Sequence, residues 1–249
     1  MTTETTIEAP GSHGGGDGEG EEHAHDHPKF LAHHFDTPVQ QFDAAKLGMW
    51  AFLGQELLFF SGLFVAYGVF RMWHGEAFAL ASHQLDKTMG TVNTIVLLFS
   101  SLTAALAVRS SQRGEKDKTS ILLILTILCA CIFLVVKWFE YEHKFHSGLL
   151  PGKWFGVARS FPGGEVLKGE EIPELPRAAS AFFSLYFVMT GVHAIHIIVG
   201  IGVLTWILKR NLNGEFSKEF FTPVDNVALY WHLVDLVWIY LFPLLYLID

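Results

Sequence analysis

The sequence is poor in charged residues and has almost no cysteine. Asp, Glu, Lys and Arg make up 17% of its 249 residues, against about 25% in an average soluble domain. Lys and Arg form no basic patch of the kind that nucleic-acid binding requires, so no nucleic-acid partner is predicted. The two cysteines, Cys129 and Cys131, share one apolar run. They project from different sides of a helix, which argues against a common thiolate metal site.

The N-terminal segment carries most of the net charge. Its first 36 residues hold eight acidic residues against Lys29 alone, which accounts for nearly all of the formal −8. The run GSHGGGDGEGEEHAHDH is rich in Gly, Glu and His, and such a composition cannot bury enough apolar surface to offset the entropy of ordering. We therefore predict a disordered acidic, His-rich tail over 1–37 and one membrane domain over 38–249. A transition-metal site at the tail histidines is the alternative to a plain solvated tail.

Apolar length is what the sequence has in abundance. Hydrophobic residues make up 51% of the chain and gather in five long runs, at 47–70, 89–108, 121–139, 178–208 and 227–248. Each run is close to or above the roughly 20 residues that a helix needs to cross a hydrocarbon core about 30 Å thick. The pattern predicts an all-α membrane protein, a bundle of five transmembrane helices.

Basic residues give the predicted orientation of this bundle. They cluster after the second run and after the fourth, as Arg109, Arg113, Lys116, Lys118, Lys209, Arg210 and Lys218. In a five-span chain both connectors lie on the same side as the N-terminus. Because short cytoplasmic loops carry an excess of Lys and Arg, we expect the N-terminus inside and the C-terminus outside.

Polar residues stand within the predicted spans, where lipid is expected, among them Gln55, Glu56, His193, His196, His232 and Asp235. An ionised group at the centre of a span costs about 3 kcal/mol or more, so each needs a partner. At about 1.5 Å rise per residue, Glu56, His196 and Asp235 reach overlapping depths. We therefore predict one polar cluster that joins three helices. Glu56 is expected either to stay protonated or to pair with His196 or His232.

Five sequence blocks surround these polar residues in a fixed order. They are LGMWAFLGQELLFF with Glu56, VNTIVLLFSSLTAALAV, KWFEYEHKF with Glu140 and Tyr141, MTGVHAIHIIVG with the two histidines, and LYWHLVDLVWIYLF. Together they resemble subunit III of haem–copper cytochrome oxidases, in the five-span form that lacks the first two spans of the larger form. Two positions depart from the family pattern: Lys137 stands where Gln is common, and Ala194 where Gly is common.

The resemblance implies a non-redox subunit of a proton-pumping terminal oxidase, multi-pass in the bacterial inner membrane. Haem and copper are then expected in partner subunits, with no metal and no catalytic residue in this chain. The implied partners are subunit I as the main contact, subunit II, a small subunit IV as a further candidate, and membrane lipids. The implied role is to stabilise the catalytic subunit, bind structural phospholipid and support proton uptake in aerobic respiration.

The resemblance also implies where lipid binds. It suggests that the first two spans separate from the other three, so that a lipid-filled groove lies between a two-helix and a three-helix group. Trp50, Phe59, Phe60 and Phe64 are expected to line this groove. The polar residues within the spans, Gln55 and Glu56 above all, are expected to affect proton or lipid binding. Glu140 and Tyr141 form a polar block at the outer end of the third span.

Two other classes of function use the same residues. A stand-alone membrane metal or haem protein would take His193, His196, His232, Glu56 and Asp235 as ligands. Haem ligation by two histidines requires facing helices, and a pair three residues apart on one helix suits that poorly. A small proton-coupled transporter is the second alternative, although the sequence shows no internal repeat and no pair of broken helices.

Overall fold

The structure is a computed structural model that describes residues 32, 35–147, 149–150 and 178–248. Nearly all of the predicted tail, with its histidines, and most of the long loop before residue 178 lie outside these residues. The described part forms six helices: α1 (Pro38–Trp73), α2 (Gly75–Ser82), α3 (Lys87–Gln112), α4 (Lys116–His146), α5 (Ala179–Leu212) and α6 (Thr222–Tyr246). Five of them are long and apolar enough to cross a membrane, which confirms the predicted all-α architecture with five spans.

The helices begin and end where local chemistry favours it. The Thr37 hydroxyl accepts a hydrogen bond from the backbone N–H of Gln40 at 3.2 Å and caps α1. Asp86 caps two backbone N–H groups at the start of α3 in the same way. Gly114 and Gly214 follow the C-terminal ends of α3 and α5 with φ of 74° and 75°, a left-handed conformation that glycine adopts without steric cost.

The short helix α2 was not predicted. It lies in the connector between the first two predicted spans and is too short to give a membrane signal. Its apolar side is buried, since Phe78 packs edge-on against Tyr67 of α1 at 5.5 Å and against Phe182 of α5 at 5.3 Å. This helix therefore ties α1 to α5 at one end of the bundle, called here the α2 end.

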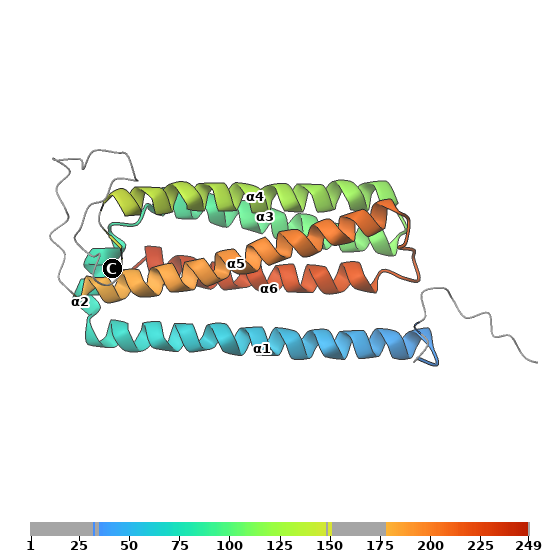
Figure 1. Cartoon of the computed structure of the whole chain (residues 1–249), viewed down its shortest axis with the longest axis horizontal. Helices are drawn as coiled ribbons and strands as arrows, with labels where there is room; N and C mark the ends of the chain where they lie inside the picture. Colours follow the sequence, from blue (N-terminus) through green and yellow to red (C-terminus); the bar gives the residue numbers. More distant parts are fainter. Residues whose placement is uncertain (1–31, 33–34, 148, 151–177, 249) are drawn as a thin grey trace, which may run out of the picture.

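The long helices divide differently from the prediction. Helix α3 packs against α4 and α6, α5 packs against α4 and α6, and α1 contacts α5, α6 and α2. Figure 1 shows α1 running along one side of the other four. The expected pairing of the first two spans is therefore wrong for the described residues. The physical reason is that α3 places its small and polar side chains against α4 and α6.

Small residues allow this close packing of α3 to α6. A Cβ added to Gly90 of α3 would lie 2.7 Å from Phe242, and one added to Gly200 of α5 would lie 2.6 Å from Trp231. The hydroxyls of Thr103 and Thr126 join α3 to α4 at 2.8 Å. In α1, by contrast, only 6% of the most apolar window is buried, against 33–44% in the other long helices. The tight core is thus formed by α3, α4, α5 and α6.

Candidate functional site: the groove along α1

Glu56 and His196 meet between α1 and α5. The distance from His196 Nε2 to Glu56 Oε2 is 3.0 Å, and both side chains are largely buried. His196 Nδ1 lies 2.8 Å from the carbonyl oxygen of Val192, an acceptor, so Nδ1 carries a hydrogen. Nε2 then either accepts a hydrogen bond from a neutral carboxyl group or donates one to a carboxylate. Of the two partners predicted for Glu56, the structure places His196 in contact.

Two neighbouring cavities flank this pair and are here called the α1 groove. The deep cavity, of about 420 Å³, is lined by Glu56 and His196 and by mainly apolar side chains of α1, α5 and α6, among them Met49, Phe52 and Val199. The end cavity, of about 530 Å³, lies towards the N-terminal ends of α1 and α6. Asn226 and Val227 line both cavities, so the two lie next to each other.

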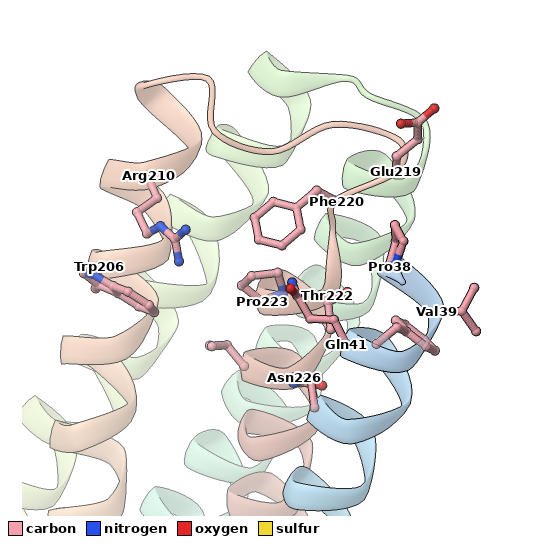
Figure 2. A pocket seen from close by; sticks show the side chains of 13 residues that line it. Pro38, Val39, Gln41, Trp206, Arg210, Glu219, Phe220, Thr222, Pro223 and Asn226 are labelled. Carbon is pink, nitrogen blue, oxygen red and sulfur yellow. The ribbon is translucent and has the colours of Figure 1, made fainter. Parts of the chain in front are cut away.

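The end cavity brings polar groups to the mouth of the groove. Figure 2 shows Arg210 and Trp206 on α5, across the cavity from Pro223 and Phe220. The Arg210 guanidinium lies 4.8 Å from the Trp206 ring and donates to Glu215 at 2.7 Å. The groove is therefore apolar along its depth and polar at its end.

Three polar contacts hold α1 to α5 and α6. Besides the Glu56–His196 bond, Lys46 forms an ion pair with Asp225 near the end cavity. At the other end, the Tyr67 hydroxyl donates to the carbonyl oxygen of Leu244 at 2.5 Å. Neither contact was predicted. Lys46 and Tyr67 lie near span ends, where polar residues are common and do not indicate a functional site.

The aromatic residues predicted to line a groove take other positions. Trp50 and Phe59 are exposed, Phe60 is buried 5.1 Å from the His196 ring, and Phe64 packs 6.3 Å from Tyr240. None of the four lines either cavity of the α1 groove. Gln55 is exposed on α1, away from Glu56. The residues that do line the groove include Phe52, two turns before Phe59 on the same face of α1, and Val199 of α5.

The predicted single polar cluster does not form within the described residues. His232 Nδ1 lies 2.7 Å from the hydroxyl of Ser101, on the α3 side of α6. Asp235 is buried beside Ser101 but forms no hydrogen bond of normal geometry. His193 is fully buried and stacks on Trp238 at 5.4 Å. Overlapping depth is therefore not proximity, since these groups face different neighbours across the core.

A second polar centre lies in the tight core and was missed apart from two of its residues. Lys137, Glu140 and Lys144 of α4 meet Tyr186 of α5 and Tyr246 of α6, and these five residues are called the buried ion cluster. The predicted neighbour Tyr141 lies beside it and bonds to the Thr190 hydroxyl at 2.5 Å. The i, i+3 and i, i+4 spacing of the charges was the available signal.

The described residues offer little to a metal ion or a haem. Among them, no three His, Cys, Asp or Glu side chains converge as metal ligands would. His196 is engaged at both ring nitrogens, and His193 is packed between the aromatic rings of Trp238 and Phe133.

Comparison with known proteins identifies the chain. A family model described as cytochrome c oxidase subunit III matches residues 173–249. Cytochrome c oxidase subunit 3 of Corynebacterium diphtheriae is 32% identical over 206 residues, which are 82% of this chain and 87% of that relative. Quinol oxidase subunit 3 of Bacillus spizizenii is 30% identical over 207 residues, covering 82% of this chain and 86% of the relative.

A further relative joins two subunits in one protein. The haem–copper oxidase subunit I+III of Aeropyrum pernix is 28% identical over 212 residues, which cover 83% of this chain but 23% of that relative. With the five apolar spans, these matches make the chain a multi-pass bacterial membrane protein that acts within an oxidase complex. The chain belongs to the subunit III family of haem–copper oxidases.

Proposed function

We propose that this chain is the non-redox subunit III that binds a phospholipid in the α1 groove and supports the catalytic subunit during sustained turnover. The observation that carries the proposal is the groove itself, apolar along its depth and polar at its mouth. Haem and copper then belong to partner subunits. The engaged and enclosed histidines of the spans support this division of labour.

The groove has the chemical character that a phospholipid requires. An acyl chain would lie against Phe52, Ile195 and Val199 in the deep cavity. The phosphate would lie at the end cavity, where Arg210 supplies the planar donor set that suits phosphate oxygens. Arg210 shares its Nε–H with Glu215, at a distance of 2.7 Å. Its other nitrogens leave donors for the headgroup.

Glu56 and His196 give the same groove a titratable centre. The ion pair and the neutral pair contain the same number of protons, so the pair can change from one to the other without exchanging a proton with water. A third state, in which both groups are protonated, takes up one further proton from outside. The pair can therefore buffer a proton beside the bound lipid.

Subunit I is the proposed main partner, with subunit II and a small subunit IV as further neighbours. The support is the relative from Aeropyrum pernix, whose name joins subunits I and III in one protein. A fusion of this kind keeps two polypeptides at a fixed ratio and within reach of each other. It fits a permanent contact between them.

The test fills the groove without touching its polar groups. Val199 lines the deep cavity, whereas its neighbour Ile198 does not; they are 51% and 57% exposed, respectively. In the purified oxidase, Val199→Trp should reduce the phospholipid retained per complex and shorten the period of steady turnover. Ile198→Trp should do neither. Equal lipid content and equal working life for both variants would contradict the proposal, with native mass spectrometry and oxygen consumption as the two readouts.

A further inference from the structure

The buried ion cluster has two cations for one anion. Lys137, Glu140 and Lys144 are 5%, 2% and 2% exposed. Lys137 Nζ donates to Glu140 Oε2 at 2.7 Å, and Lys144 Nζ donates to Glu140 Oε1 at 3.3 Å. Burial makes surplus charge costly, so the protonation state of such a cluster matters more than that of an exposed ion pair.

Tyrosine hydroxyls complete a continuous hydrogen-bond network in the cluster. Tyr246 accepts from Lys137 at 2.6 Å and donates to Glu140 Oε1 at 2.5 Å. Tyr186 donates to the same oxygen at 3.0 Å. When any of these groups gains or loses a proton, the hydrogen bonds of its neighbours in the network can therefore rearrange.

A cavity connects this network to the α2 end of the bundle. Its volume is about 310 Å³, and Glu140 and Lys144 line it together with His83, Gln84, Asp86 and His143. His83, Gln84 and His143 are exposed residues, so the cavity opens towards the aqueous phase. A bound water needs about 30 Å³ and two to four polar partners, and this cavity offers room and partners for several.

We propose that the buried ion cluster is a proton-exchange site for the aqueous phase at the α2 end, with cavity water as proton donor and acceptor. In one direction the Lys144 ammonium gives a proton to water, leaving an amine and a hydronium ion. In the other, the Glu140 carboxylate takes a proton from hydronium. Neither step needs a redox partner or a second substrate.

The exchange responds to charged and titratable groups on every element around the cluster. Asp86, at the start of α3, lines the cavity opposite Lys144, with His83 after α2 and His143 on α4. On the bundle side, Tyr186 comes from α5 and Tyr246 from α6. His193 lies beyond Trp238, whose ring is 4.4 Å from Lys137 Nζ. The site is distinct from the α1 groove and does not depend on a lipid there.

Infrared difference spectroscopy of the intact oxidase in proteoliposomes tests this proposal. Spectra taken between acidic and alkaline buffer should contain carboxylate and tyrosine bands from the cluster. Glu140→Gln should remove the carboxylate band. Tyr246→Phe should remove the tyrosine band while keeping all three charged groups, and it remains informative if Glu140→Gln does not assemble. Identical spectra for wild type and Tyr246→Phe would show a fixed structural cluster and overturn the proposal.

A second variant tests the cavity as the route of exchange. Met89 lines the cavity, and Met89→Trp fills it without altering an ion pair. After a switch to D₂O buffer, the cluster bands of Met89→Trp should shift several-fold more slowly than those of wild type. Met72→Trp, on the exposed side of α1, should shift at the wild-type rate. Equal rates for all three proteins would show that water does not reach the cluster through this cavity.

Discussion

The two sides of α5 show two ways of joining transmembrane helices. On one side, α5 packs into the tight core with α4 and α6, where rings and glycines fit closely and charges are fully enclosed. On the other side, α1 is held mainly by three polar contacts, with two cavities between them. The first arrangement fixes a structure, and the second leaves room for a ligand of variable shape.

The difference follows from the residues that α5 turns to each neighbour. Gly200 lets the Trp231 ring approach its backbone, which continuous packing requires. His196, one turn earlier, reaches towards α1 instead and leaves the space beside it unfilled. Since lipid chains are as apolar as leucine, helices associate in membranes through close packing and polar bonds. This protein uses both means along α5, close packing at Gly200 and a polar bond at His196.

The largest loss of stability is expected from the buried ion cluster. Glu140→Leu leaves two ammonium groups without their carboxylate, and breaking a buried ion pair from one side costs about 3–5 kcal/mol. The variant subunit should dissociate from the oxidase or be absent from the membrane, as measured by thermal unfolding of the purified complex. The double variant Lys137→Met/Glu140→Leu should recover part of the loss, because it removes a surplus charge. A double variant less stable than Glu140→Leu would contradict this explanation.

A glycine pair on α5 tests the packing difference directly. Gly200→Val forces a side chain into the Trp231 ring, and such overpacking costs about 1–3 kcal/mol. Gly202→Val is the matched control, since a Cβ at Gly202 meets nothing within 4 Å. The melting temperature of the complex should fall for Gly200→Val alone. Equal falls would mean that Gly202 faces a partner subunit.

The groove should respond mainly in function. Glu56→Gln keeps a side chain that can bond to His196, so the stability change should stay near 1 kcal/mol, the range of one hydrogen bond. The subunit should remain assembled, while inactivation during sustained turnover becomes faster or its pH dependence changes. The measurement compares initial rate, inactivation rate and proton uptake with wild type. If all three quantities are the same for the variant and the wild type within error, Glu56 contributes to helix packing alone.

The smallest effect is expected at the mouth of the groove. Lys46 and Asp225 are 21% and 22% exposed, and ion pairs of this exposure contribute about 0–1 kcal/mol. Lys46→Met should therefore lower the melting temperature slightly at low salt and not at all at high salt. A large loss independent of salt would place this ion pair inside a protein interface.

The sequence predicted the helices of this structure more readily than the contacts between them. The five apolar runs predict the spans because length and hydropathy are local properties. The i, i+4 charges Glu140 and Lys144 were visible as well, yet their partners Tyr186 and Tyr246 lie 46 and 106 residues from Glu140. No local pattern links residues that far apart, so the cluster appeared only with the fold.

The groove shows the same limit. Depth along each helix correctly allowed Glu56 to reach His196, but it equally allowed His232, which faces Ser101 instead. Depth fixes one coordinate of a side chain and leaves the rotation of its helix open. The aromatic residues show an error along the helix axis as well: Phe59 was predicted in the groove, whereas Phe52, two turns earlier on the same face of α1, lines it.

The most direct test of the lipid-binding account is the structure of the complete oxidase, at a resolution that shows lipids. The account predicts phospholipid density in the α1 groove, with the phosphate at Arg210 and an acyl chain against Phe52 and Val199. Side chains of another subunit filling the groove, or α1 packed continuously on α5 and α6 without ordered lipid, would contradict it.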